Sequence, residues 1–371
     1  MPPLSLLIKP VSSLCNLRCK YCFYHSLAEN RKVGYYGTMS ADTLETIVKK
    51  AFLYADKICI FAFQGGEPTL AGLDFYKNFI GYVKKYNTKN INVSCAIQTN
   101  GTLIDDEWAK FFFENKFLVG ISLDGPKDIH NYFRYDANGS SLFIKVMEAI
   151  KLLNKYKVEY NILSVVTSYS ARHVQKIYNF FKKNNFKFLQ FIPCLDPLDE
   201  KNEQDYSLTN EKYTLFLKLL FDLWYEDIKI KNMISIRLFD SFLGTILRYP
   251  PDTCGTNGIC SANLVIEADG SVFPCDFYVL DKWLLGNINE NNFGDILNSK
   301  IIKEFINESY NINPECEMCR FNKLCKGGCK RYKEPLNGKN DKNNYCLAYK
   351  NFFEYAEERL FELANLYKNA R

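Results

Sequence analysis

The chain has 371 residues, of which 47% are hydrophobic and 24% charged, a globular balance that excludes a wholly disordered protein. The 47 basic and 42 acidic residues give a net charge of +5 without forming a basic stripe, so we expect no nucleic-acid partner. No run approaches the roughly 18 apolar residues of a membrane span, and the N-terminus lacks the basic segment of a signal peptide. We therefore expect a soluble, cytoplasmic protein that does not bind membranes.

The first 195 residues alternate apolar strand patterns with amphipathic helical patterns. We expect strands at 5–9, 58–63, 91–97, 118–122, 159–166 and 188–192. We expect helices at 41–55, 73–86, 105–115, 141–156 and 171–184. Strands separated by helices predict a parallel sheet, either doubly wound or closed into a barrel. Polar or glycine-rich segments follow nearly every strand, which favours a partial (β/α)6 barrel, because barrels build their sites at the carboxyl ends of all strands.

After about residue 205 the pattern changes to a segment rich in Cys, Gly and Asn. Its expected elements are a long helix at 210–228, short strands at 264–267 and 271–273 that form a hairpin, and a closing helix at about 347–367. Small elements with little apolar periodicity need cross-links, and eight cysteines lie in this region. We predict two domains, a barrel at 1–230 and a cysteine-rich domain with the closing helix at 231–371.

Fourteen cysteines in a chain without an export signal indicate metal binding rather than disulfides. The first group, Cys15, Cys19 and Cys22, has the sequence CNLRCKYC. Three thiolates can hold a cubane iron–sulfur cluster and leave one iron open to an outside ligand. The alternative is a structural zinc site with His25 as the fourth ligand.

This first group resembles the signature of the radical S-adenosylmethionine superfamily, CxxxCxxC with an aromatic residue before the last cysteine. The sequence Gly65-Gly66-Glu67-Pro68 resembles the GGEP motif of the same family. The resemblance implies that the amino and carboxylate groups of S-adenosylmethionine bind the open iron. The residues that it assigns to this cofactor are Tyr21, Gly65, Gly66, Glu67, Ser122 at the ribose, Arg134 at the methionyl carboxylate and main-chain groups near Leu195 at the adenine. The alternative for Arg134 is a surface arginine on a loop.

The C-terminal cysteines resemble the SPASM domain, an extension of radical enzymes that modify peptides. The resemblance implies two auxiliary [4Fe-4S] clusters, one held by Cys254, Cys260, Cys275 and Cys329 and the other by Cys316, Cys319, Cys325 and Cys346. With the N-terminal cluster, this makes three [4Fe-4S] clusters. A pair of zinc ribbons is the alternative. The remaining Cys59, Cys95 and Cys194 are expected to be buried thiols.

Over nearly its whole length the chain is similar to the anaerobic sulfatase-maturating enzyme family. The stretches that carry this similarity are Ile8-Lys9-Pro10 before CNLRCKYCFYHSL, then FAFQGGEPTLAGL, QTNGTLID, SLDGPKDIHN and DGSVFPCDFYVLDKW. The similarity implies oxidation, without oxygen, of a cysteine or serine in a sulfatase motif of the type C/S-x-P/A-x-R to Cα-formylglycine. In this chemistry a 5′-deoxyadenosyl radical removes a hydrogen atom, a base takes a proton and an auxiliary cluster accepts an electron.

Asp276 directly follows the expected ligand Cys275, so the resemblance makes it the proton acceptor. Its alternative role is to cap a turn after the strand. Gln64, just before GGEP, is expected to contact the substrate backbone. A small acidic flavodoxin or ferredoxin is the expected electron donor for this mildly basic chain.

Two other functions remain open from the sequence. The first is a SPASM enzyme that forms thioether or carbon–carbon crosslinks in a ribosomal peptide. Such enzymes often carry an N-terminal peptide-recognition domain, for which Cys15 leaves no room here. The second is a zinc-stapled binding protein without catalytic chemistry.

Overall fold

The computed structural model describes residues 3–198, 204–334 and 342–369, and the chain divides into two compact units. Unit 1 comprises residues 1–122, 131–160 and 262–305, and unit 2 comprises residues 123–130, 161–261 and 306–371. Each unit therefore combines segments from the N-terminal half of the chain with segments from the C-terminal half. The predicted boundary at residue 230 separates a radical domain from an auxiliary-cluster domain, whereas the two units are separated by their internal contacts. The predicted boundary stays a prediction.

Unit 1 is built on a sheet in which four strands run parallel in the order β1-β2-β3-β4. On the other side of β1, strand β8 continues the sheet in parallel, and β9 and β10 follow it antiparallel. These strands are β1 (Leu4–Ile8), β2 (Ile58–Phe63), β3 (Asn92–Thr99), β4 (Phe117–Ser122), β8 (Leu264–Ile266), β9 (Ser271–Phe273) and β10 (Gly286–Asn287). Late segments of the chain thus extend the sheet that the first strand began.

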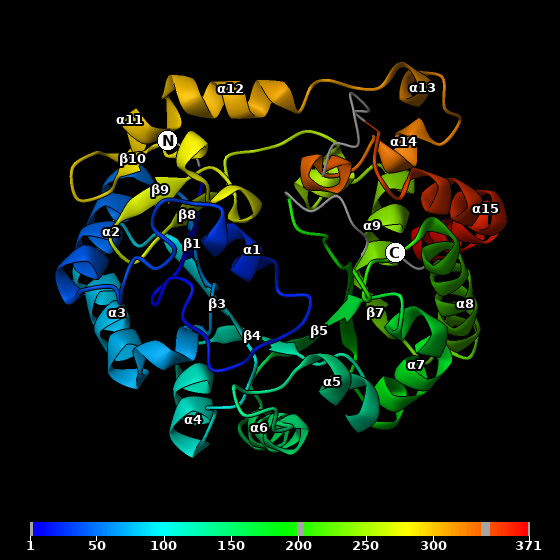
Figure 1. Cartoon of the computed structure of the whole chain (residues 1–371), viewed down its shortest axis with the longest axis horizontal. Helices are drawn as coiled ribbons and strands as arrows, with labels where there is room; N and C mark the ends of the chain where they lie inside the picture. Colours follow the sequence, from blue (N-terminus) through cyan, green and yellow to red (C-terminus); the bar gives the residue numbers. More distant parts are fainter. Residues whose placement is uncertain (1–2, 199–203, 335–341, 370–371) are drawn as a thin grey trace. The chain divides into compact units, whose positions relative to one another are not determined.

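The helices of unit 1 are α1 (Phe23–Glu29), α2 (Ala41–Tyr54), α3 (Leu73–Tyr86), α4 (Asp106–Glu114), α6 (Phe143–Tyr156) and α11 (Phe293–Leu297), with short 3₁₀ turns at Pro68–Ala71, Asp276–Tyr278 and Asp281–Trp283. Of these, α2, α3 and α4 stand outside strands β1 to β4 in Figure 1. Local signals fix their starts: the Ser40 hydroxyl accepts a hydrogen bond from the amide of Thr43, and Asp105 caps α4 in the same way. The chain passes between the units within α5 (Lys127–Phe133) and α12 (Lys300–Glu308).

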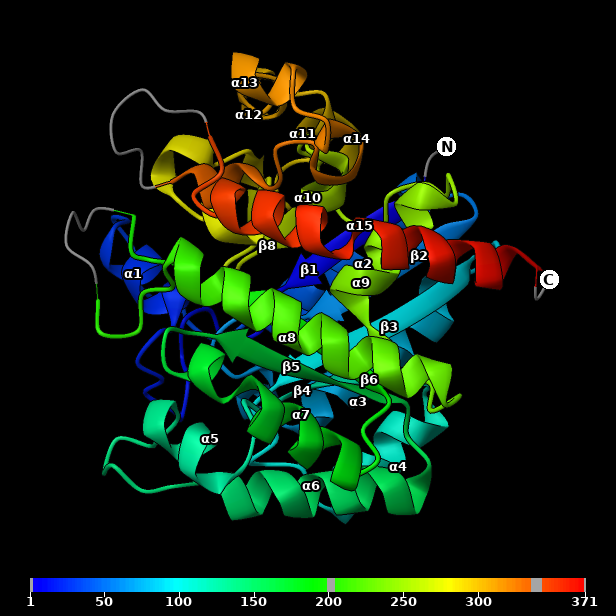
Figure 2. The same cartoon turned by 90° about the vertical axis from the view of Figure 1, so that its right-hand side faces the viewer.

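Unit 2 contains a second group of parallel strands, in the order β5-β6-β7. Its long helices α8 and α15 pack along each other (Figure 2). The elements are β5 (Tyr160–Val166), β6 (Phe188–Pro193), β7 (Ser235–Ile236), α7 (Val174–Lys183), α8 (Asn210–Lys229), α9 (Arg237–Ile246), α10 (Cys254–Asn257), α13 (Pro314–Glu317), α14 (Asn322–Cys325) and α15 (Cys346–Asn369), with 3₁₀ turns at Ser170–His173 and Lys330–Lys333.

All six strands predicted before residue 195 are present, and their bounds differ from the predicted ones by at most two residues. The predicted hairpin, the long helix and the closing helix are also confirmed. The helices that were not predicted are α1, α5, α9, α11 and α12, together with the four-residue helices α10, α13 and α14.

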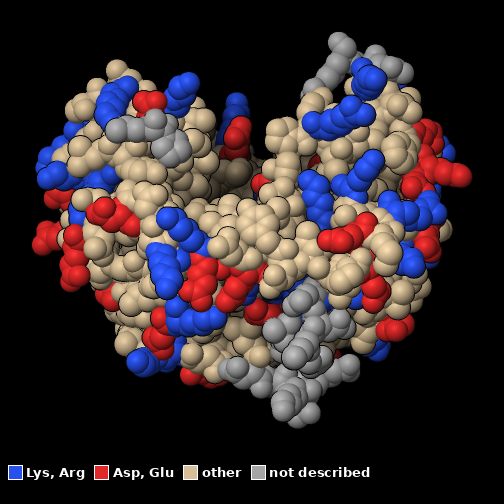
Figure 3. Space-filling view, turned by 90° about the horizontal axis from the view of Figure 1, so that it is seen from above, with Lys and Arg blue, Asp and Glu red and all other residues tan. Residues whose placement is uncertain are grey.

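Among the described residues, no helix is long and apolar enough to cross a bilayer. On the face drawn in Figure 3, basic and acidic side chains are interspersed.

Candidate active site

The loop after β1 carries Cys15, Cys19 and Cys22 in unit 1. The amide of Cys22 donates to the carbonyl of Cys19 at 3.1 Å, and Cys22 occupies the N-cap of α1. Burial raises the pKa of the Cys15 thiol to about 11 and also raises the pKa of Cys22. A thiol with a raised pKa becomes a thiolate more readily beside a cation, so these donors fit a positively charged iron centre.

The glycine-rich turn after β2 holds this cysteine loop in place. Gly66 has φ +56°, and a Cβ on it would lie 2.1 Å from the carbonyl oxygen of Leu14. The amide of Glu67 donates to the same oxygen at 2.8 Å. The turn and the residue before Cys15 are therefore in direct backbone contact, which only glycine permits at position 66.

Glu67 is buried, and its carboxylate accepts hydrogen bonds from this chain's own groups. Its Oε1 accepts from the amide and hydroxyl of Thr69 at 3.0 and 2.6 Å and from the Thr99 hydroxyl at 2.7 Å. Its Oε2 accepts from the amide of Asn100 at 2.7 Å. Burial raises the pKa of this carboxyl. Glu67 thus ties the ends of β2 and β3 together, and its direct contact with a cofactor stays a prediction.

Arg134 is buried beside the cysteine loop, so its interpretation as a surface arginine is wrong. Its Nη1 lies 4.0 Å from the Sγ of Cys19, and its guanidinium carbon lies 5.4 Å from the centre of the Tyr21 ring. The amide of Lys20 donates to the carbonyl of Phe133 at 3.0 Å, which fixes the two segments side by side. Tyr21, Cys19 and Arg134 are therefore brought together, as expected for parts of one site.

Two further predicted cofactor residues lie at strand ends. Ser122 ends β4, and its hydroxyl accepts a hydrogen bond from the Gln98 side chain at 3.0 Å. Leu195 follows β6 in unit 2 and is buried. Next to it, the carbonyl of Cys194 accepts a hydrogen bond from the Tyr345 hydroxyl at 2.8 Å. The roles of Ser122 and Leu195 stay predictions.

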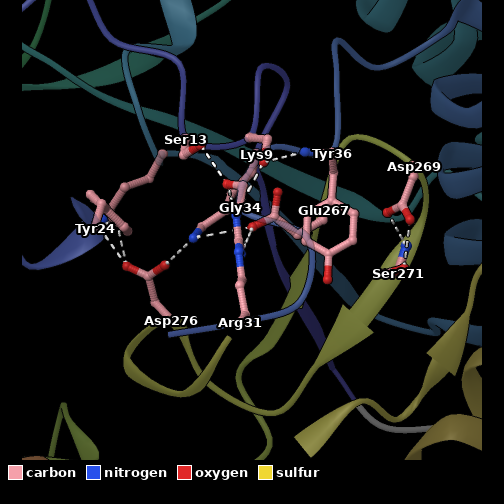
Figure 4. A network of polar contacts seen from close by, with 12 residues as sticks. Lys9, Ser13, Tyr24, Arg31, Gly34, Tyr36, Glu267, Asp269, Ser271 and Asp276 are labelled. Atoms are coloured by element: carbon pink, nitrogen blue, oxygen red, sulfur yellow. Dashed lines mark hydrogen bonds and ion pairs between the residues drawn. The ribbon is translucent and has the colours of Figure 1, made fainter. Parts of the chain in front are cut away.

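Asp276 lies in unit 1 among polar side chains that converge on its carboxylate (Figure 4). Its Oδ2 accepts hydrogen bonds from the Tyr24 hydroxyl at 2.5 Å and from Gln64 Nε2 at 3.1 Å. Its Oδ1 lies 3.3 Å from Lys9 Nζ. These contacts are with side chains rather than with a turn backbone, so they favour a site residue over a turn cap.

Tyr24 belongs to this group but was not predicted. Besides Asp276, its hydroxyl contacts Gln64 Nε2 at 2.8 Å. Burial first, and the Asp276 charge second, raise the pKa of Tyr24 well above its usual value, so the phenol stays a proton donor. Its position two residues after Cys22, on the first turn of α1, is a sequence signal that could have revealed it.

The C-terminal cysteines lie as follows. In unit 2, a hydrogen bond with Cys329 lowers the pKa of Cys254 to about 7, and Cys260 interacts electrostatically with Cys254. Cys275, in unit 1, follows β9 and caps the 3₁₀ turn that begins at Asp276. The four cysteines of the second predicted set all lie in unit 2, where Cys316, Cys319 and Cys346 act on the pKa of Cys325, which burial raises to about 11.

No disulfide joins any of the fourteen cysteines, all of which lie in described residues. Cys59, Cys95 and Cys194 are buried, as predicted. Across residues 3–198, 204–334 and 342–369, no three His, Cys, Asp or Glu side chains are arranged around a single ion. The cysteines of a cubane each bind a different iron, so they do not converge on one point in this way.

Comparison with known families matches two parts of the chain. The model of the Radical SAM superfamily matches residues 10–181, and that of the SPASM iron–sulfur cluster-binding domain matches residues 257–320. With the parallel β/α sheet and the cysteine loop after β1, these matches define the class: a radical S-adenosylmethionine enzyme with a C-terminal iron–sulfur domain.

Relatives refine this class. The chain is 55% identical over 367 residues to a cysteine-type anaerobic sulfatase-maturating enzyme of Clostridium perfringens, with 98% of this chain and 99% of the relative covered. It is 33% identical to a serine-type enzyme of Bacteroides thetaiotaomicron, with 95% and 89% covered. A solved structure described as native anSMEcpe with bound AdoMet and Cp18Cys peptide superposes with a TM-score of 0.94 at 53% identity, covering 98% of this chain and 99% of that one. The chain belongs to the anaerobic sulfatase-maturating enzymes.

Proposed function

We propose that this enzyme oxidises a cysteine of a sulfatase polypeptide to Cα-formylglycine. The observation that carries the proposal is the 55% identity, over nearly the full length of both chains, to a cysteine-type enzyme. The serine-type relative is more distant, at 33% identity. Cysteine is therefore the proposed substrate residue, a choice that the sequence patterns alone left open.

The placement of the cysteine loop beside the glycine-rich turn supports a role for Cys15, Cys19 and Cys22 as ligands of the first cluster. The open position of that cluster would take S-adenosylmethionine, beside Gly65 and Gly66 and within reach of Arg134. Arg134 is the only cation in this proposed set, so it suits the cofactor's carboxylate. For the auxiliary clusters, we propose the two sets of four cysteines that the resemblance to the SPASM domain implies. Together these assignments make three [4Fe-4S] clusters.

Oxidation of the substrate requires three removals from its –CH2–SH group. A hydrogen atom leaves the Cβ, a proton leaves the sulfur, and one electron leaves the resulting radical anion to give a thioaldehyde. Water then replaces sulfur as hydrogen sulfide and leaves the aldehyde. When bound, S-adenosylmethionine and the clusters supply the hydrogen-abstracting radical and accept the electron.

The protein's own part in this chemistry is the removal of the proton. Asp276 Oδ2 is the proposed acceptor, and Oδ1 faces the ammonium of Lys9 at 3.3 Å. The ammonium therefore holds Oδ1 and leaves Oδ2 as the oxygen that is to take the proton. Gln64, whose amide donates to Asp276, is proposed to contact the substrate near the same atom.

The partner follows from the family: a sulfatase polypeptide is the proposed substrate. The finer proposals are that it carries a C-x-P/A-x-R type motif and that a small acidic flavodoxin or ferredoxin delivers the electrons. We also keep the proposal that residues 1–230 form the radical domain and residues 231–371 the auxiliary-cluster domain.

The test is an anaerobic assay with a short peptide that contains C-x-P-x-R, alongside its serine counterpart. We expect formylglycine from the cysteine peptide, measured by mass spectrometry, with 5′-deoxyadenosine as co-product. Asp276→Asn should still form 5′-deoxyadenosine but lower formylglycine by about 100-fold or more, because the proton acceptor is lost. Unchanged product in this variant would remove Asp276 as the base. A crosslinked peptide that retains its sulfur would instead identify a peptide maturase.

A further inference from the structure

Four charged side chains of unit 1, one of them the proposed base Asp276, form a largely buried quartet (Figure 4). The side chains of Lys9 and Arg31 are each 3% exposed, Glu267 is fully buried, and Asp276 is 13% exposed. Two cations and two carboxylates cancel in charge, which is the condition for burying them at all. Glu267 and Arg31 have no part in the chemistry described so far.

Strand pairing fixes the backbones of two members of the quartet. Lys9 directly follows β1 and Glu267 directly follows β8, and these strands pair in parallel with Ile8 opposite Ile266. The amide of Lys9 donates to the carbonyl of Ile266 at 2.9 Å. The two side chains therefore start from neighbouring strand ends, with little freedom to move apart.

Glu267 links the two cations through a single oxygen. Its Oε1 accepts a hydrogen bond from Arg31 Nη1 at 2.8 Å and lies 3.6 Å from Lys9 Nζ. Arg31 is held in turn, because its Nη2 donates to the carbonyl of Gly34 at 2.9 Å and its guanidinium lies over the ring of Tyr36. Glu267 is thus anchored on one side and faces Lys9 on the other.

Lys9 is confined along its whole length. A Cβ on Gly65 would lie 2.6 Å from Lys9 Cγ, so the stem of the lysine passes directly over this glycine. The ammonium lies 4.5 Å from the centre of the Tyr24 ring and 3.3 Å from Asp276 Oδ1. Within the described residues, Asp276 Oδ1 receives no hydrogen bond. Its polar contact is therefore the ion pair with Lys9 Nζ.

We propose that Glu267 is a positioning residue for the oxidation, acting through Lys9. By holding the ammonium against Oδ1, it turns the other oxygen of Asp276 toward Tyr24 and Gln64, where the substrate proton is to be accepted. This inference rests on the proposed role of Asp276. It also gives Gly65 a second function, which is to leave space for the lysine stem.

The test compares Glu267→Gln, Lys9→Met and the double variant as cluster-loaded holoenzymes, with the cysteine peptide as substrate. The readout is the ratio of formylglycine to 5′-deoxyadenosine, together with the KM for the peptide and the spectrum of the first cluster with S-adenosylmethionine. Glu267→Gln should lower the ratio about tenfold by misplacing the base, with KM and spectrum unchanged. Because both residues act along one path, the double variant should lose no more than Lys9→Met alone.

A matched control is Asp227→Asn in unit 2. Asp227 is also a buried acid, bonded to Tyr178 at 2.8 Å and Lys182 at 2.5 Å, but it is no part of the proposed site. This variant should lower the melting temperature and leave the product ratio unchanged. Suppose that Asp276→Asn loses formylglycine but Glu267→Gln keeps the normal ratio of formylglycine to 5′-deoxyadenosine. That result would overturn the inference but not the proposed function. If Glu267→Gln does not load its clusters, an unchanged ratio in Lys9→Met overturns the inference by itself.

Discussion

Gly66 is the residue at which the glycine-rich turn and the cysteine loop meet, and its backbone contact with Leu14 makes a clear prediction. Gly66→Ala places a methyl group 2.1 Å from the Leu14 carbonyl oxygen, so one of the two segments must move. Since Cys15 follows Leu14, the first cluster should lose at least half its occupancy, with a matching fall in 5′-deoxyadenosine. Iron analysis and electron paramagnetic resonance of the reduced protein measure this loss.

The control for this variant is Gly139→Ala. Gly139 also has a positive φ, +75°, but a Cβ there would meet no atom within 4 Å. Both substitutions force alanine into the left-handed region, at roughly 1–2 kcal/mol each, so their difference isolates the contact with Leu14. Equal cluster loss in the two variants would show that strain, not this contact, is responsible.

At the same scale, the sequence predicted site residues unevenly. The cysteines, GGEP and Asp276 stand in motifs whose spacing reflects their chemistry, so they could be found. Lys9 lies in a stretch that resembles the family, but neither its contacts nor those of Glu267 could be predicted. Those contacts depend on the parallel pairing of β1 with β8, which joins residues more than 250 positions apart. Tyr24 lies close to the cysteine motif, but a tyrosine in an aromatic-rich segment is equally consistent with a core residue and with a site residue.

At the scale of elements, we predict that the short helices around the second C-terminal cysteine set fold only when metal is bound. Helices α13 and α14 have four residues each, far below the roughly 12–15 at which an isolated helix becomes stable. Removing iron anaerobically with a chelator should therefore raise amide hydrogen exchange at 314–325 at least tenfold. Exchange in α2 and α3 should not change, because buried apolar faces hold these helices. Protection that persists at 314–325 without iron would contradict metal-dependent folding.

Helix ends were predicted most accurately where the apolar periodicity was long, and all the missed helices have ten residues or fewer. Helices such as α2, α3 and α8 bury one face over 14 residues or more, and the sequence located their ends within a residue or so. Helix α9 was missed although Phe239, Phe242 and Leu243 form a buried face, because the Cys, Gly and Asn content of the surrounding segment suggested loops. Helix α9 packs against α15, and this tertiary contact stabilises a helix whose ten-residue apolar pattern is too short to predict it.

For the whole molecule, the predicted ligand sets fix how much metal each variant holds. Three [4Fe-4S] clusters require about twelve irons per chain, and replacing Cys15, Cys19 and Cys22 together by alanine should leave about eight. This triple variant should make no 5′-deoxyadenosine, while the absorbance of the auxiliary clusters remains. Replacing Cys59, Cys95 and Cys194 by alanine serves as the matched control, since these thiols are buried in the core, and it should keep about twelve irons at some cost in stability. If the triple variant at 15, 19 and 22 still held about twelve irons, the first cluster would have to be bound by other residues. If it lost all its iron, the three clusters would have to load as a single cooperative unit.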